Sequence, residues 1–220
     1  MKSKSHIALG RYLVAHYFNN TSPLHARAFL IGCVQPDKNP TTYLKGSLRQ
    51  QWLRGHNWDN SKKYMQRIAS RLAERRKLNI LDYYTLGKLI HYTSDAFTYP
   101  HNREFQDALQ SHIGYEAELQ QYFLSYLNTV PAGLLKESDA IMETIRTYHK
   151  RYMRTVQSIY TDAFYTVAVC SSIATALLPQ SYKKPPLPPS GRGVLFFNQG
   201  FPNKCTSHSV PGADSILHRD

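Results

Sequence analysis

Five side chains of the kinds that bind metal ions lie within 26 residues of this chain. They are His91, Asp95, His101, His112 and Glu116. His91 precedes Asp95 by four residues, and His112 precedes Glu116 by the same interval. Residues four apart share one face of an α-helix, so each pair can hold an ion where its segment is helical. The pattern therefore predicts two helices, each of which presents a pair of metal ligands.

The third histidine of this run is expected to come from a turn. Pro100 cannot continue the helix that carries His91 and Asp95, so the chain turns there and brings His101 to the site from another direction. Imidazole and carboxylate ligands without a thiolate are typical of hydrolytic zinc sites rather than of structural zinc fingers. We therefore interpret the run as part of a hydrolytic zinc site.

Helical periodicity extends over most of the chain. The predicted helices cover residues 5–18, 24–33, 59–78, 80–97, 111–127, 135–153 and 155–178. Ser5 is the expected cap of the first helix, and Asp59 or Asn60 that of the third. The second is expected to end before Pro36, and residues 38–58 form a long loop with at most one short helix. No alternating strand pattern of useful length occurs, so the predicted fold class is all-α, a single-domain helical bundle.

The character of the chain changes at Pro179. Residues 183–191 read Lys-Lys-Pro-Pro-Leu-Pro-Pro-Ser-Gly, a polyproline-like linker, and the residues after them lack hydrophobic periodicity. We expect one helical domain over residues 1–178 and a proline-rich, disordered tail over residues 179–220. The alternative is that the tail is a proline-rich ligand for an aromatic groove of a partner.

The net charge of the chain is strongly positive, at +12. Residues 181–220 hold 5 basic and 2 acidic side chains, so most of the excess belongs to the predicted domain. A basic surface favours anionic partners such as phosphate esters, nucleic acid or acidic lipid headgroups. Much of the charge lies between Lys62 and Lys77, where the simpler interpretation is the solvent-exposed face of a helix.

The cysteines and the apolar segments indicate the compartment. The three cysteines are odd in number and in no paired spacing, so they imply no disulfide framework. The N-terminal residues lack the apolar segment of a secretory signal. The longest nearly apolar stretch, residues 166–178, is too short and too rich in Ser and Thr to span a bilayer. We therefore expect a cytoplasmic protein with no transmembrane segment.

Several short motifs occur in an order that resembles the zinc-dependent phospholipase C family. That family shares its fold and its trinuclear zinc site with the P1/S1 single-strand nucleases. The motifs are Ser5-His6, Asp37, the Gly55-His56 pair, His91-x3-Asp95-x5-His101 and His112-x3-Glu116. The resemblance covers residues 5–178, leaves the tail unmatched, and implies a helical domain with a trinuclear-type zinc site.

The resemblance also implies which residues bind two or three zinc ions. The first ion would be held by Asp37, His56, His91 and Asp95. The second would be held by His101, His112 and Glu116. The third would be held by His6 and by Asp95 as a bridge, although His25 is a rival to His6. In the family an N-terminal Trp completes this third site. Here Met1 precedes His6 instead, so we expect the third site to be weak or empty.

The activity implied by the resemblance is that of a zinc-dependent phosphodiesterase acting on phospholipid headgroup phosphoesters. Asp37 would position or deprotonate the attacking water, and contact with an anionic membrane would be peripheral. The first alternative is a P1/S1-like nuclease, whose nucleic-acid track would use Trp52, Trp58 or Tyr43. The second is a metal-binding relative that has lost activity. Lys38 after Asp37, and the lack of an acidic residue before His6, disfavour a cationic headgroup.

Overall fold

Seven α-helices and two short 3₁₀ helices account for most of the residues that the computed structural model describes, which are 1–42, 55–105, 109–131 and 140–178. The α-helices are α1 (Ser3–Tyr17), α2 (Pro23–Lys38), α3 (Trp58–Ala73), α4 (Ile80–Ala96), α5 (Leu109–Leu127), α6 (Ile141–Tyr152) and α7 (Ile159–Leu177). The 3₁₀ helices are η1 (Pro40–Thr42) and η2 (Tyr99–His101). These residues contain no strand, so the prediction of an all-α fold is confirmed.

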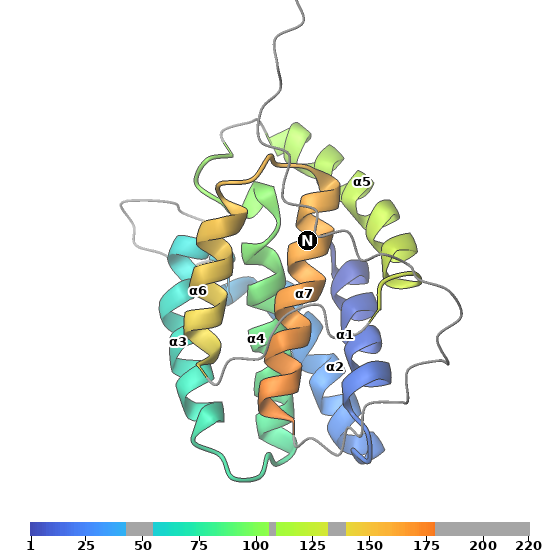
Figure 1. Ribbon diagram of the computed structural model, residues 1–220, viewed down its shortest axis with the longest axis vertical. Helices are drawn as coiled ribbons and strands as arrows, with labels where there is room; N and C mark the ends of the chain where they lie inside the picture. The colour runs from blue at the N-terminus through green and yellow to red at the C-terminus, as the bar shows by residue number, and fades with distance from the viewer. Residues whose placement is uncertain (43–54, 106–108, 132–139, 179–220) are drawn as a thin grey trace, which may run out of the picture. The chain divides into compact units, whose positions relative to one another are not determined.

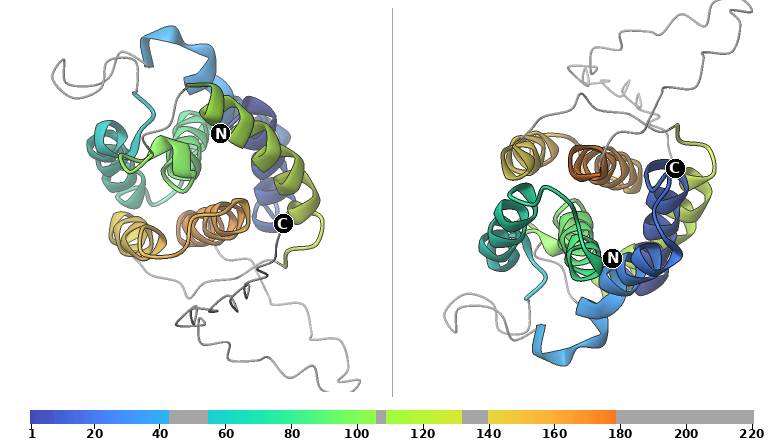
Figure 2. Two further views of the ribbon diagram at one scale, coloured as in Figure 1. Left: turned by 90° about the horizontal axis from the view of Figure 1, so that it is seen from above. Right: turned by 90° about the horizontal axis from the view of Figure 1, so that it is seen from below.

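Helix α4 occupies the middle of the helical bundle. It packs against α1, α2, α3 and α7. Helix α6 packs against α3 and α7, and helix α5 packs against α1 and α7. Figure 1 shows α7 in front of α4, with α1 and α2 on one side and α3 and α6 on the other, and Figure 2 shows the same bundle from its two ends. Every residue from Leu89 to Ala96 is buried. Burial of His91, Ser94 and Asp95 in this stretch is costly unless other groups inside the protein bond to them.

The contact between α2 and α4 is unusually close because glycines line it. A Cβ added at Gly87 would collide with the backbone carbonyl of Phe29, and one added at Gly32 would collide with the carbonyl of Tyr84. Without side chains at these two positions, the helix backbones approach each other directly. This approach lets His91 on α4 reach the backbone of α2.

Several predicted helix ends need correction. Helix α1 begins at Ser3, so Ser5 is not its cap but lies inside it, and the Ser3 hydroxyl donates to Asp37 Oδ2 at 2.6 Å. Helix α3 begins at Trp58, with Asn57 in place of Asp59 or Asn60 at its cap, and Trp58 stacks on the ring of His149.

Helix α2 continues through Pro36 to Lys38. A proline removes a single backbone N–H, and the amide of Asn39 still bonds to the carbonyl of Gln35 at 3.1 Å. As a result, Asp37 lies on the last turn of a helix and not in a loop. Asn79, which lies between two of the predicted helices, caps α4 in a reciprocal capping box with Asp82.

The later helices are shorter than the sequence predicts. Helix α6 covers Ile141–Tyr152, and α7 covers Ile159–Leu177 with the Ser158 side chain accepting from the amide of Thr161 at 3.1 Å. The predicted tail over residues 179–220 and much of the predicted loop over residues 38–58 lie outside the described residues. Among the helices that the structure describes, none is long and apolar enough to cross a membrane.

Candidate metal centre

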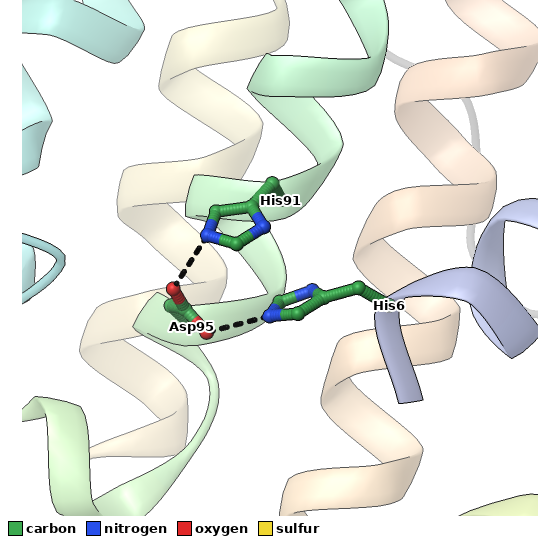
Figure 3. A group of neighbouring side chains, drawn as sticks. All are labelled: His6, His91 and Asp95. Carbon is green, nitrogen blue, oxygen red and sulfur yellow. Dashed lines mark ion pairs between the residues drawn. The ribbon is translucent and has the colours of Figure 1, made fainter. Parts of the chain in front are cut away.

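The centre is built around the first helical pair, His91 and Asp95 on α4. Both side chains are buried, and His91 Nε2 lies 3.2 Å from Asp95 Oδ2. His6 on α1 approaches the other oxygen of this carboxylate, with its Nε2 3.2 Å from Asp95 Oδ1, and its ring stacks on that of His91 (Figure 3). The two oxygens of Asp95 therefore face different imidazoles, which is the arrangement that a bridging carboxylate requires.

Asp37 and His56 form a second cluster with His91. Asp37 Oδ1 lies 3.5 Å from His91 Nε2 and 3.7 Å from His56 Nδ1. His56 Nδ1 in turn lies 3.2 Å from Asp95 Oδ2 and 3.2 Å from His91 Nε2. The four residues that the family resemblance assigns to the first zinc ion thus meet in one small volume.

The outer nitrogens of His91 and His56 donate to the protein. His91 Nδ1 lies 2.8 Å from the carbonyl oxygen of Cys33, which can only accept, so Nδ1 carries the proton. His56 Nε2 lies 3.1 Å from the hydroxyl of Thr42, whose own hydrogen goes to nearby backbone carbonyls, so Nε2 carries the proton. The other nitrogen of each ring faces the second ring and the Asp95 carboxylate. This arrangement is the one expected of metal-binding histidines, whose outer nitrogen donates to the protein.

His6 has the same arrangement. Its Nδ1 lies 3.0 Å from the hydroxyl of Ser94, which donates to the carbonyl of His91 and therefore accepts from His6. The inner Nε2 is buried and forms no hydrogen bond, although it lies beside Asp95. Burial, and after it the neighbouring His91 ring, lower the pKa of His6 to about 4, so the ring is neutral near pH 7. A buried lone pair without a donor fits a metal ligand.

The second helical pair lies on α5 beside η2. His112 Nε2 lies 3.4 Å from Glu116 Oε1, and His101 Nε2 lies 3.1 Å from the same oxygen. One ligand atom from each of these three residues lies within 4.8 Å of the other two. The His112 side chain is 28% exposed, against 15% for Glu116 and 12% for His101. This group therefore borders on solvent.

The α-amine of Met1 lies between Asp95 and the group of His101, His112 and Glu116. It donates to Asp95 Oδ1 at 2.7 Å and contacts Glu116 Oε1 at 3.0 Å and His101 Nε2 at 2.9 Å. Burial by itself lowers the pKa of this amine, but the carboxylates of Asp95 and Glu116 outweigh burial and raise it to about 10. A protonated amine takes the place of a metal cation among these acceptors, whereas a neutral amine can be a ligand.

The two inner carboxylates remain ionised. Burial raises the pKa of Asp95, but the Met1 ammonium and the surrounding histidines outweigh burial and hold that pKa well below its usual value. For Glu116 the same ammonium and the contacts with the rings of His101 and His112 outweigh burial and lower the pKa. Ionised carboxylates beside imidazole nitrogens are a ligand set that Zn²⁺ binds.

All eight residues chosen from the sequence lie in three groups of potential ligands. The groups are His6, His91 and Asp95; Asp37, His56 and His91; and His101, His112 and Glu116. His25, the rival to His6, belongs to none of them, and its Nδ1 lies 2.6 Å from Ser22 Oγ in an exposed contact.

Most of the groups that contact the candidate ligands carried no recognisable sequence signal. The Cys33 carbonyl, Thr42 and Ser94 fix the tautomers of three histidines, and backbone or hydroxyl partners of this kind follow no motif. Asp162 is buried and bonds to Tyr99 and Tyr115, which lie beside ligands. One sequence feature could have pointed to Asp162: it is the one charged residue from Ile159 to Leu177.

Comparison with known families agrees with this geometry. A model described as zinc-dependent phospholipase C matches residues 5–159, the segment that carries all eight candidate ligands. No curated protein and no solved structure matches the chain. The family match covers well over half of the sequence and accords with the helical fold and the three groups of potential metal ligands. The chain therefore belongs to the zinc-dependent phospholipase C family.

Proposed function

We propose that this chain is a zinc-dependent phosphodiesterase that hydrolyses the headgroup phosphoester of phospholipids. The observation that carries the proposal is the convergence of one ring nitrogen each from His6, His56 and His91 on the buried carboxylate of Asp95. Family membership supports the same class of chemistry.

Eight residues would hold two or three zinc ions. Asp37, His56, His91 and Asp95 would hold the first, and His101, His112 and Glu116 the second. His6 and Asp95 would hold the third, beside the Met1 amine. When bound, zinc polarises phosphoryl oxygens and lowers the pKa of a bound water molecule.

Asp37 is the residue best placed to orient the attacking water and to take its proton. Its side chain is 14% exposed, whereas Asp95 is fully buried, so Asp37 is the carboxylate of the first group that reaches solvent. The hydroxyl of Ser3 donates to Asp37 Oδ2 and holds the carboxylate in place. His91 and Asp95 serve as scaffold, because their polar atoms are committed to the protein and to the ions.

The surroundings of the site support a phospholipid over a nucleic acid. Trp58, a candidate platform for stacked bases, lies instead against the ring of His149 with centroids 4.0 Å apart and planes 16° apart. One face of its indole is therefore covered. Trp52 and Tyr43, the other candidates, lie outside the described residues. Lys38 beside Asp37 favours a neutral or anionic headgroup over a cationic one.

A substrate assay tests the proposal. Zinc-loaded protein is incubated with mixed phospholipid vesicles and, separately, with single-stranded DNA. We expect release of phosphorylated headgroups from the vesicles, loss of this release with a chelator, and recovery with added zinc. Cleavage of DNA alone would replace the proposal with a nuclease activity. Inactivity on both substrates, with zinc fully bound, would replace it with an inactive metal-binding relative.

Zinc stoichiometry tests the ligand assignment. His91→Ala should remove zinc from the first group and His112→Ala from the second, each lowering the zinc content measured by elemental analysis. His25→Ala is the matched control, because this histidine is outside all three groups, and it should keep the full content. Full zinc content in both of the first two variants would contradict the assignment.

A further inference from the structure

We propose that Asp162 on α7 is a positioning residue for the group of His101, His112 and Glu116. It would hold the η2 turn, which carries His101, and helix α5, which carries Glu116, in one fixed relation. The inference rests on the proposed zinc ligation. Residue 162 lies beyond residues 5–159, so the family match assigns it no role.

The Asp162 carboxylate is fully buried, and both of its oxygens accept hydrogen bonds. Oδ2 accepts from the backbone amide of Tyr99 at 3.0 Å and from the hydroxyl of Tyr115 at 2.9 Å. Oδ1 accepts from the hydroxyl of Tyr152 at 2.7 Å. A buried acidic side chain is costly without such donors, and here three donors from η2, α5 and α6 converge on it.

Two of these three donors lie next to proposed zinc ligands. Tyr99 precedes His101 by two residues, and Tyr115 directly precedes Glu116. A single oxygen of Asp162 accepts from both, so a shift of η2 relative to α5 would break one of the two bonds. The distance of 3.1 Å between His101 Nε2 and Glu116 Oε1 depends on this same relation between η2 and α5. Asp162 therefore holds together η2 and α5, the two elements that bear the residues of the second ligand group.

The third donor provides a control on the same carboxylate. Tyr152 bonds to the other oxygen of Asp162 from α6, and no proposed zinc ligand lies on α6. Its side chain is fully buried, so losing its hydroxyl disturbs the protein interior at least as much as losing that of Tyr115. If Asp162 acts only on general stability, the two tyrosines should be equivalent in their effect on zinc. If it positions the second group, only Tyr115 should matter.

The test compares Tyr115→Phe with Tyr152→Phe in the full chain. Zinc affinities are measured by competition with a chromophoric chelator, and unfolding by denaturant gives the stability of each variant. The zinc-binding step that is lost in His112→Ala is assigned to the second ligand group, that of His101, His112 and Glu116. We expect Tyr115→Phe to weaken that step by about tenfold, the low end for partners that orient metal ligands. Tyr152→Phe should leave it within about twofold of wild type, and both should leave the first group unchanged.

The outcomes separate this inference from the proposed ligation. Equal zinc affinities in the two tyrosine variants, or equal weakening of both zinc groups by Tyr115→Phe, would overturn the positioning role. If His112→Ala itself leaves zinc binding intact, the ligation proposal fails before this comparison is made. Cobalt-substituted protein gives an independent readout, because the absorption spectrum of the second site should change in Tyr115→Phe and stay unchanged in Tyr152→Phe.

Discussion

At the residue scale, the candidate ligand atom of each of three histidines is identified by the hydrogen bond of the other ring nitrogen. His6, His56 and His91 each use one nitrogen to donate to the protein and turn the other towards carboxylates. The sequence supplies the identity and spacing of these histidines, but their tautomers depend on a carbonyl and two hydroxyls from distant segments. Long-range partners of this kind leave no periodic signal, so only the structure reveals them.

Asp37→Asn tests the proton-handling role at this scale. Asparagine keeps the shape and one oxygen but removes the charge that takes a proton, so kcat and kcat/KM should fall together. General bases contribute about 10²- to 10⁴-fold, and we expect a loss in that range in steady-state kinetics on vesicles. Asp59→Asn, at an exposed aspartate paired with Lys62, is the matched control and should be silent. A loss below about tenfold in Asp37→Asn would remove this residue from the role.

At the scale of elements, the centre depends on how closely α2 and α4 approach. Gly32 and Gly87 remove the side chains that would separate the helices, and His91 then reaches the Cys33 carbonyl at 2.8 Å. A glycine within a helix lowers helix propensity, so its presence in α4 needs a packing reason. The collision that any side chain at Gly87 would have with the backbone of Phe29 provides that reason.

Gly87→Ala should therefore destabilise the protein. The methyl group meets backbone that cannot rotate away, so we expect a loss of about 1–3 kcal/mol in the free energy of unfolding, together with weaker zinc binding at the first group. Gly114→Ala on α5 is the matched control, because an added Cβ there has no neighbour within 4 Å. It should raise stability by up to about 1 kcal/mol through helix propensity alone. Denaturant unfolding and zinc competition measure both effects, and a neutral Gly87→Ala would show that the helix contact can relax.

At the scale of the whole molecule, the sequence predicted the fold class, and which candidate ligands lie close together, better than it predicted the helix ends. Long periodic segments and ligand pairs four residues apart are local signals, and both predict α4 and α5 well. The path of α2 through Pro36 was missed, because one lost hydrogen bond is tolerated where the rest of the last turn is bonded. The role of Asp162 was missed because its donors come from three other elements.

We expect the folding unit to extend beyond the segment that the family match covers. The family match ends at residue 159, yet α7 begins there and buries Val167, Val169 and Ile173 in the same core as α4. Burial of each such side chain contributes about 1.5–3 kcal/mol, and a domain has only about 5–15 kcal/mol of net stability. Truncation after Ser158 should therefore abolish cooperative unfolding.

Truncation after Leu178 is the matched control and should have the opposite result. It removes the segment that begins at Pro179, where the hydrophobic periodicity stops, and we expect an unchanged helical circular dichroism spectrum and a melting temperature close to that of the full chain. Zinc content should also be unchanged, because all eight proposed ligands and Asp162 are retained. Unfolding of this shorter chain would mean that residues 179–220 contribute to the core. A folded protein truncated after Ser158 would mean instead that the buried face of α7 is dispensable.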